Sequence, residues 1–304
     1  MYTFIANPYA RSGRGILLWK QIEKILLEKE IAYNVLFTKY QHHATRLVHD
    51  LTSDGTPHTI VVLGGDGTLN EVIDGIRYLD KVTLGYIPLG SGNDFARGLG
   101  LPTDIHSALE QILSPSHYTA MNVGVLDYEN KHRRIAVSTG IGFDAAVCEE
   151  ALSSPIKDVL NKLKLGKLTY LGIALKQLIQ AKSIACDLIL DNKTQIHLNR
   201  FLFVASMLHQ YEGGGFKFCP AANATDGILD LCVVGKLPKP FILFALPTAF
   251  WGKHYVFPNI THYSAHEIEL HTSAPLWVHT DGEVHQKANH IKISCRKQTI
   301  RFLF

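Results

Sequence analysis

A Gly-Gly-Asp-Gly-Thr-Leu-Asn-Glu run at positions 64–71 is the strongest chemical signal in the sequence. It follows a wholly apolar segment at 59–63 and precedes a helical pattern. Glycines let the backbone approach a ligand closely, and the first N–H groups of a helix bind phosphate. Asp66 adds a carboxylate, which repels a phosphate chain unless a cation bridges the two. The run predicts a phosphate site with Mg²⁺ at Asp66; a plain Gly-Asp-Gly turn is the simpler alternative.

Two further loops have the same character. The run Asn-Pro-Tyr-Ala-Arg-Ser-Gly-Arg-Gly at 7–15 combines glycines with two arginines that suit phosphates, although such loops are often simple turns. The run Pro-Leu-Gly-Ser-Gly-Asn-Asp-Phe-Ala-Arg at 88–97 contains Ser91, which could instead cap a helix, and Asp94, a second carboxylate. There is no Gly-x-x-x-x-Gly-Lys motif, so this is not a P-loop enzyme. Three such loops at one edge of a sheet predict a ligand crevice.

The elements that must position these loops alternate between strand and helix. The predicted strands are Tyr2–Ala6, 32–38, 59–63 and 83–87, with helical patterns at 18–26 and 44–51. Because the buried strands are continuously apolar, they predict a parallel sheet covered on both faces.

The pattern changes after about residue 121. Strand-like runs joined by short turns predict a mostly antiparallel second domain, interrupted by one helical stretch at 156–181. The runs lie at 121–126, 134–139, Ile184–Leu190, 201–206, 228–234, 276–280 and 291–295. We therefore predict an α/β domain with the phosphate loops at 1–122 and a β-rich second domain at 123–295.

Composition limits the class of protein. The chain has 304 residues, 46% hydrophobic and 19% charged, which suits two globular domains. A net charge of +3 is too small to indicate nucleic acid but is compatible with anionic membrane surfaces. The five cysteines are odd in number and widely spaced, as in a reduced cytoplasmic protein. The first residues carry no basic leader, and no uncharged apolar stretch approaches about 18 residues, so we expect neither a signal peptide nor a transmembrane helix.

The motifs, taken in order, resemble the diacylglycerol kinase catalytic-domain family, especially its soluble bacterial lipid kinases. The resemblance rests on the runs at 64–72 and 91–96, Gly-Ile-Gly-Phe-Asp-Ala at 140–145, the glycine-rich and Asp-Gly stretch at 213–230, and Asp-Gly-Glu at 281–283. These motifs cover nearly the whole chain, and we find no large departure from the family pattern.

The resemblance implies a fold and a set of site residues. The implied fold is a phosphofructokinase-like α/β nucleotide-binding domain with a parallel sheet at 1–122 plus a mainly antiparallel β-sandwich domain for the lipid substrate at 123–295. The last strand, about 296–304, returns to the first domain. A structural Mg²⁺ is implied at Asp226 with the main chains of Asn223 and Ile228, and the proton acceptor matches Glu283. The implied nucleotide-binding residues are Asn7, Pro8, Ser12, Gly13, Gly15, Thr38, Gly64, Gly65, Asp66, Gly67, Thr68, Leu69, Asn70 and Ser91.

The predicted reaction is phosphoryl transfer from Mg-ATP to a lipid hydroxyl. Such catalysis depends mainly on positioning and on neutralising charge. Asp66 and Asp94 would organise Mg²⁺, and Glu283 would accept the hydroxyl proton. The expected lipid is diacylglycerol or a related lipid, because no residue pattern in the sequence specifies a headgroup. A kinase of a soluble acceptor such as NAD, or a non-catalytic lipid-binding homologue, is the alternative.

Two segments are candidates for peripheral membrane contact. Lysines recur along the helical stretch at 157–182. They could bind anionic lipid, or they could form the solvent-exposed face of a helix that packs on the core. The apolar run at 241–251 could meet a membrane, cover the substrate cleft or be buried. A homodimer is a possible partner arrangement that the sequence does not decide. The alternation of His279, Asp281, Glu283 and His285 could hold a transition metal on a strand, but Gly282 favours a turn there.

Overall fold

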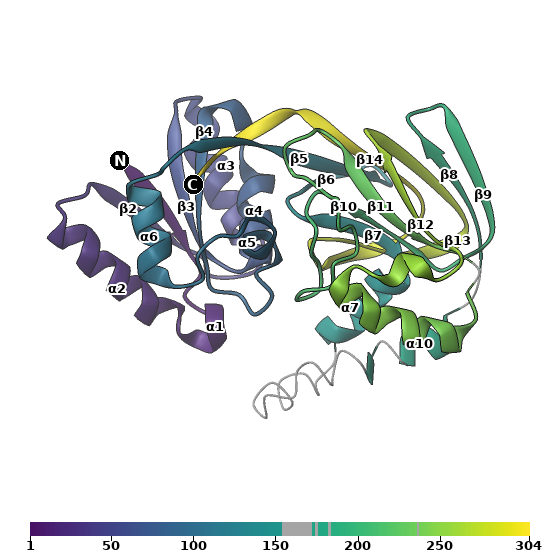
Figure 1. Ribbon diagram of the computed structural model, residues 1–304. Coiled ribbons are helices and arrows are strands. Elements are labelled where there is room, and N and C mark those ends of the chain that lie inside the picture. The colour runs from purple at the N-terminus through teal and green to yellow at the C-terminus, as the bar shows by residue number, and fades with distance from the viewer. Residues whose placement is uncertain (154–171, 174–175, 182–183, 236) are drawn as a thin grey trace.

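The computed structural model describes residues 1–153, 172–173, 176–181, 184–235 and 237–304. Two parts lie side by side, and both termini belong to the first of them (Figure 1). The helical stretch predicted at 156–181 lies largely outside the described residues.

The first part is a parallel sheet with helices on both faces. Its strands follow the order β4-β3-β1-β2, and they pair in parallel with continuous register. The helices α2 and α6 pack on one face through residues such as Trp19 and Leu109, and α3 and α4 pack on the other through Val48 and Leu69. The strands are β1 (Tyr2–Ala6), β2 (Tyr33–Phe37), β3 (His58–Gly64) and β4 (Val82–Pro88). The helices are α1 (Ala10–Gly13), α2 (Gly15–Glu28), α3 (His43–Leu51), α4 (Asp66–Gly75), α5 (Asp94–Leu99) and α6 (Ile105–Leu113).

The second part is mainly antiparallel, and its strands enclose an apolar interior that contains Ile141, Leu188 and Ile293. A second apolar cluster joins the outer face of β10 and β11 to α10 through Phe203, Cys232 and Ile242. The strands are β5 (Tyr118–Tyr128), β6 (Lys131–Ile135), β7 (Ser138–Gly142), β8 (Ile184–Leu190), β9 (Thr194–Phe201), β10 (Phe203–Met207), β11 (Leu229–Val234), β12 (Ile260–Ala265), β13 (Glu267–Thr280) and β14 (Glu283–Leu303). The helices are α7 (Phe143–Ser153) and α10 (Lys239–Thr248). Short 3-10 helices lie at Thr52–Asp54, Leu79–Lys81, Ala249–Trp251 and His254–Val256.

Strand β14 joins the two parts. It is 21 residues long and pairs antiparallel with β13 and β5. Its last residues pair in parallel with β4, with Arg301 opposite Thr83. In Figure 1 it crosses from the second part to the first as the yellow ribbon. The predicted fold class, a parallel α/β part followed by a mainly antiparallel β part, is confirmed.

Several predicted strand boundaries were wrong. The run at 134–139 is divided between β6 and β7, because the chain turns at Ala136 and Val137. The runs at 276–280 and 291–295 are pieces of the long strands β13 and β14. The strand β9 was missed because its outward residues are polar and only Phe201 is buried. Among the described residues, no helix is long and apolar enough to cross a membrane.

Candidate active site

An open cleft of about 460 Å³ lies at the carboxyl ends of the parallel strands. Its lining comes from the three predicted glycine loops and from the segment after β2: Asn7, Tyr9, Ala10, Arg11, Thr38, Lys39, Tyr40, Gln41, Gly65, Gly67, Thr68, Glu71, Leu89 and Gly90. Two of these loops touch, because a Cβ on Gly65 would lie only 3.1 Å from the Cα of Gly90. A side chain at Gly65 would therefore push the loops apart.

The first loop is tied to the second by side chains. The Asn7 Nδ2 atom donates to Thr68 Oγ1 at 3.3 Å, and its Oδ1 accepts from the Tyr9 N–H at 3.0 Å. A Cβ on Gly15 would overlap the Asn7 carbonyl oxygen at 2.1 Å. Thr38 is buried at the floor of the cleft, with 7% exposure. Five of the residues predicted to bind nucleotide, Asn7, Thr38, Gly65, Gly67 and Thr68, therefore lie at one cleft.

The remaining predicted nucleotide residues lie elsewhere. Leu69 and Gly64 are fully buried, Leu69 in the apolar core and Gly64 against the Thr68 side chain. Ser12 lies in α1, and Pro8 lies just before that helix. Gly13 ends the helix with a φ of +86°. Ser91 is exposed in a turn and does not cap α5, whose N-cap position is held by Asn93.

The cap of α5 comes instead from Asp66. Its Oδ2 atom accepts from the Asp94 N–H at 3.0 Å, and its Oδ1 atom accepts from the Phe95 N–H at 3.2 Å. A carboxylate at a helix N-terminus is stabilised by the exposed N–H groups and the helix dipole. Burial nevertheless raises the pKa of Asp66 above its ordinary value. Asp66 therefore joins the second and third glycine loops directly.

Asp94 is the second carboxylate at this point. Its Oδ1 atom accepts from Arg97 at 2.7 Å, and its Oδ2 atom accepts from the Gly214 N–H, in the second part of the chain, at 2.7 Å. Burial and the nearby Asp66 carboxylate raise the pKa of Asp94 to about 6.

The two carboxylates converge beside Gly92, where a Cβ would lie 3.4 Å from an oxygen of each. Two buried carboxylates, one of which raises the pKa of the other, are an arrangement that a divalent cation relieves. Asp66 and Asp94 therefore fit Mg²⁺ by their donor chemistry.

Glu71, also on α4, has a similar structural role. Its two carboxylate oxygens accept from the backbone N–H groups of His42 and Ala44, at 2.9 and 3.1 Å. It thereby caps α3 as Asp66 caps α5, and the chain that it holds contains Gln41, which lines the cleft. The sequence identified Glu71 only as part of the motif and did not predict this contact.

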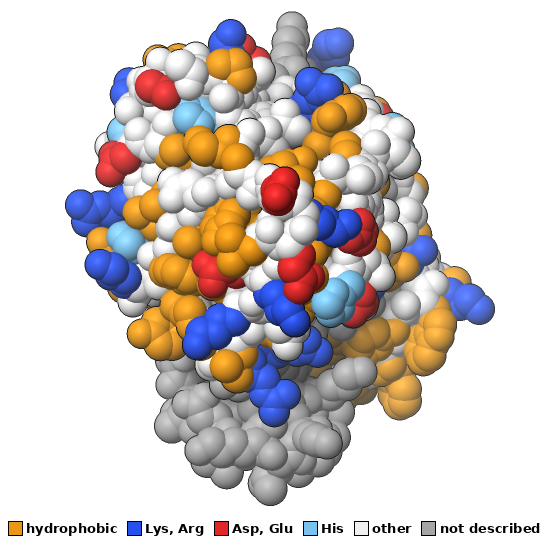
Figure 2. Space-filling model, turned by 90° about the vertical axis from the view of Figure 1, so that its left-hand side faces the viewer, with side chains coloured by type: hydrophobic (Ala, Val, Ile, Leu, Met, Phe, Trp, Pro, Cys, Tyr) orange, Lys and Arg blue, Asp and Glu red, His pale blue; other side chains and the backbone are white. Residues whose placement is uncertain are grey.

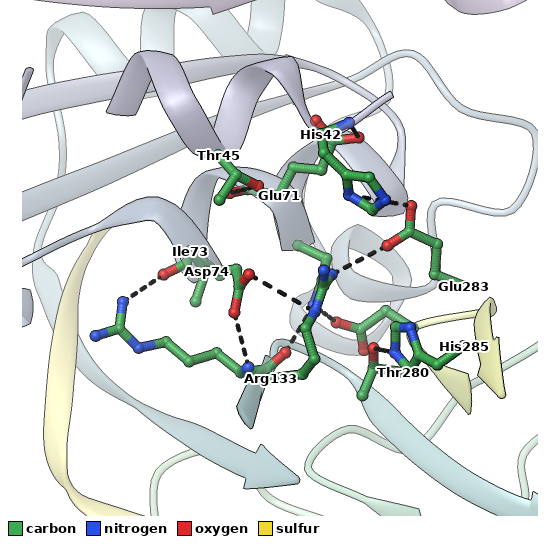
Figure 3. Close-up of polar contacts among 12 residues, drawn as sticks. His42, Thr45, Glu71, Ile73, Asp74, Arg133, Thr280, Glu283 and His285 are labelled. Carbon is green, nitrogen blue, oxygen red and sulfur yellow. Dashed lines mark hydrogen bonds and ion pairs between the residues drawn. The ribbon is translucent and has the colours of Figure 1, made fainter. Parts of the chain in front are cut away.

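Glu283 points toward His42 and Arg133 (Figure 3), and it reaches the cleft through Gln41. Its Oε1 atom accepts from Gln41 Nε2 at 2.8 Å, and its Oε2 atom forms an ion pair with Arg133 at 3.0 Å. The side chain is 16% exposed. Arg133 is itself held between Asp74 and the Asn70 Oδ1 atom, at 3.6 and 2.9 Å. The sequence did not identify Arg133, because it lies outside every motif.

The turn that carries Glu283 is fixed by Asp281. This carboxylate accepts from the backbone N–H groups of Ala136, Val137 and Ser138, at 2.8, 2.7 and 2.8 Å. It also accepts from Asn70 Nδ2 at 2.5 Å. Asp281 therefore joins α4 of the first part to the β6–β7 connection of the second. Asn70, predicted to bind nucleotide, is 1% exposed and holds the two parts together.

A buried cluster of Asp144, Glu212 and His279 lies behind this turn. The His279 Nε2 atom is 3.2 Å from an oxygen of each carboxylate, and the Gly282 N–H points to its Nδ1 atom at 3.3 Å. Burial lowers the pKa of His279, but the Glu212 and Asp144 carboxylates outweigh it and raise the pKa to about 9, so Nε2 carries a proton toward the carboxylates rather than a lone pair for a metal. Burial raises the pKa of Glu212 to about 7. The alternating residues at 279–285 do not share one strand face, because residues 281–282 form a turn.

The predicted structural Mg²⁺ site lies on an exposed turn. Asp226 Oδ1 accepts from the Ile228 N–H at 2.9 Å, and Asn223 Oδ1 accepts from the Thr225 N–H at 3.1 Å. Asn122 Oδ1 accepts from the Gly227 N–H at 2.8 Å. A carboxylate with main-chain carbonyls is a donor set that Mg²⁺ accepts, but side chains already hold this turn without a cation.

Two family models match the chain. The diacylglycerol kinase catalytic domain matches residues 1–125, and the YegS C-terminal NAD kinase beta sandwich-like domain matches residues 136–303. Among curated proteins, the "Putative lipid kinase YtlR" of Bacillus subtilis is 29% identical over 291 residues, covering 92% of each chain. The diacylglycerol kinase of the same organism is 29% identical over 289 residues, covering 92% of this chain and 88% of that protein.

Solved structures show the same likeness. A crystal structure described as a "putative diacylglycerol kinase" from Bacillus anthracis has a TM-score of 0.77 and 26% identity, covering 100% of this chain and 97% of that one. An NAD kinase from Archaeoglobus fulgidus, solved with ATP, has a TM-score of 0.54 and 14% identity, covering 100% of this chain and 94% of that one. At that identity the second likeness is one of fold.

Proposed function

Because this chain belongs to the diacylglycerol kinase catalytic-domain family of lipid kinases, we propose that it transfers the terminal phosphate of Mg-ATP to the hydroxyl of diacylglycerol or a related lipid. The observation that supports this most directly is the convergence of Asp66 and Asp94 beside Gly92, in a region that the glycine loops form. Two neighbouring buried carboxylates whose repulsion a divalent cation would offset suit a phosphotransferase that uses Mg-ATP.

The nucleotide would bind in the cleft at the ends of β1, β3 and β4. The backbone N–H groups of the loops around Gly65 and Gly90 would hold phosphate oxygens, and Arg11 at the rim adds positive charge. Asp66 and Asp94 would hold Mg²⁺, which when bound neutralises charge on the transferring phosphate. Arg97 and the Gly214 N–H fix the Asp94 carboxylate for that role.

Glu283 would accept the proton of the lipid hydroxyl. Arg133 and Gln41 each engage one of its oxygens, so the carboxylate has one orientation at the cleft edge. A general base works when it lies within hydrogen-bond reach of the proton that it removes. The remaining lone pairs of this carboxylate can meet a hydroxyl that enters from the second part of the chain.

We further propose that the protein works in the cytoplasm at a membrane surface. ATP is the phosphate donor, the lipid acceptor resides in a bilayer, and the five cysteines are free thiols. A second Mg²⁺ at Asp226, with the main chains of Asn223 and Ile228, is part of the proposal. The closest alternative is a kinase whose acceptor is a soluble molecule such as NAD, so the identity of the acceptor distinguishes the two proposals.

The test is a labelled-ATP assay with Mg²⁺ and separate acceptors: diacylglycerol, phosphatidylglycerol and sphingosine in mixed micelles, and NAD in solution. We expect label in one lipid product and none in the NAD reaction. The Glu283→Gln variant is the matched control, because it retains the nucleotide loops. Label in NAD, or ATP turnover that no lipid stimulates, would contradict the lipid kinase assignment.

A further inference from the structure

The outward face of α10 and the short helix that follows it is apolar and exposed. The buried face packs through Ile242 and Ala245, whereas the other side faces solvent. Phe244 is 71% exposed and Trp251 is 70% exposed. The exposed large apolar residues of this segment, here called the α10 face, are Phe241, Leu243, Phe244, Phe250, Trp251 and Val256. Large aromatic side chains gathered in this way mark a binding surface.

Within the chain segment that forms the α10 face, the charged side chains are all basic. The chain contains no acidic residue between Asp230 and Glu267. Lys239 begins α10 and Lys253 follows Trp251, so basic side chains lie at both ends of the face. The outer face of the first part differs, because Figure 2 shows acidic and basic side chains interspersed with apolar ones there. Aromatic residues between lysines suit the boundary of an anionic bilayer, with the rings among the lipids and the ammonium groups at the phosphates.

The α10 face is also continuous with the candidate active site. Phe250 stacks on Phe216, with ring centroids 4.0 Å apart. Phe216 and Glu212 exchange backbone hydrogen bonds across the glycine loop, and Gly214 at the tip of that loop donates to Asp94. A bilayer on the α10 face would therefore be linked by a short series of contacts to Asp94.

We propose that the α10 face docks the protein on an anionic lipid bilayer. The inference deepens the proposed function, on which it rests for the identity of the lipid as substrate. Of the two segments considered from the sequence, it assigns the contact to the apolar run at 241–251. Phe244 and Trp251 enter the bilayer boundary, and Lys253 contributes attraction to anionic headgroups.

The test is flotation of the full-length protein with vesicles of phosphatidylcholine alone and with added phosphatidylglycerol, without nucleotide. We expect the double variant Phe244→Ser/Trp251→Ser to lower the vesicle-bound fraction about tenfold on both vesicles, because apolar insertion is lost. Lys253→Gln should lower binding about fivefold on the anionic vesicles only. The matched control is Leu27→Ser on α2, a residue with 65% exposure in the first part, which should bind as the wild type does.

A spectroscopic arm tests the contact without destabilising changes. Trp251 is the most exposed of the three tryptophans, since Trp19 is 2% exposed and Trp277 is only partly exposed. Vesicles should shift the wild-type tryptophan emission to shorter wavelength, and Trp251→Phe should bind vesicles but lose that shift. Unchanged flotation of the double variant would overturn the proposal. So would a dimer in solution that Phe244→Ser converts to monomer without any vesicle binding by the wild type.

Because flotation needs no turnover, it separates the two proposals. A protein that binds vesicles through the α10 face but labels no lipid would leave the docking surface intact and remove the proposed activity. Both proposals are supported if the double variant phosphorylates a water-soluble short-chain acceptor at the wild-type rate but phosphorylates a substrate in a bilayer more slowly than the wild type does. A double variant that phosphorylates lipid in vesicles as fast as the wild type contradicts the docking surface alone.

Discussion

The two sides of the candidate site are built in different ways. On the first side, α4 carries Asp66 and Glu71, and each carboxylate caps a neighbouring helix through backbone N–H groups. On the second side, Asp281 and His279 are held by residues that are distant in the sequence, such as Ala136 and Asp144.

The sequence separations show the contrast. Asp66 lies 28 residues from Asp94, whereas Asp281 lies 211 residues from Asn70. The first side is a local unit that a motif can encode. The second side exists only when the two parts of the chain are in contact, so its groups should respond to changes that weaken that contact.

The largest effect is expected for Asp66→Ala. It removes a proposed Mg²⁺ ligand, so we expect turnover to fall about 10³-fold or more. It also removes the α5 cap, so the free energy of unfolding should fall by about 1–2 kcal/mol. Steady-state kinetics and urea denaturation measure the two effects.

Asp66→Asn separates these roles. An asparagine oxygen still caps a helix but has no charge for Mg²⁺, so we expect restored stability with turnover still lost. Wild-type turnover in Asp66→Asn would show that this side of the site is only structural.

The next effect concerns the proton acceptor on the second side. Glu283→Gln keeps an oxygen for Arg133, so the turn should persist, but the base is lost. We expect kcat to fall about 10²–10⁴-fold, with unchanged ATP binding measured by calorimetry. Glu28→Gln on α2 is the control, and unchanged kcat in Glu283→Gln would remove this role.

Asp281→Asn tests whether the second side depends on the contact between the two parts. The amide has one acceptor oxygen where the carboxylate serves three backbone N–H groups and Asn70. Leaving buried donors unpaired should lower the free energy of unfolding by about 3 kcal/mol. Asp80→Asn, at an exposed position, should change it by less than about 0.5 kcal/mol. Equal stabilities of the two variants would show that the carboxylate is not needed.

A smaller effect follows from the raised pKa of Asp94, about 6 against an ordinary 3.8. The cation needs the deprotonated carboxylate, so kcat/KM for Mg-ATP should rise with pH and level off above about 6. Stability should move the other way. A carboxyl whose pKa is raised in the folded state favours folding when protonated, so its contribution is lost as pH rises from about 4 to about 6. Asp94→Asn should abolish both dependences, and an activity profile that is flat between pH 5 and 8 would contradict the assignment.

The smallest effect is expected at the exposed turn. If Asp226 holds Mg²⁺ with the main chains of Asn223 and Ile228, saturating Mg²⁺ should raise the Tm by about 2–5 °C. Asp226→Ala should lose that increase, and the Asn122 contact to Gly227 should keep the turn folded. A wild-type Tm that does not respond to Mg²⁺ would rule out the site.

The sequence by itself determined the first side. The apolar strands, the glycine loops and Asp66 are neighbours along the chain, and the rule that parallel strands present their carboxyl ends at one edge placed Asn7, Gly65 and Gly90 at one cleft. It also identified the antiparallel character of the second part, because alternation and turn residues are local signals.

Only the tertiary structure decided which groups support that site. Arg133 lies in no motif, yet it meets Glu283 across 150 residues, and Gly214 meets Asp94 across 120. Asn70 was assigned to the nucleotide through its motif, and only the structure shows that it contacts Asp281. Such contacts depend on how the two parts of the chain pack against each other, and local propensity carries no information on that packing. Only the structure shows that the α10 face is exposed, because an apolar run has the same sequence pattern whether it is buried or faces solvent.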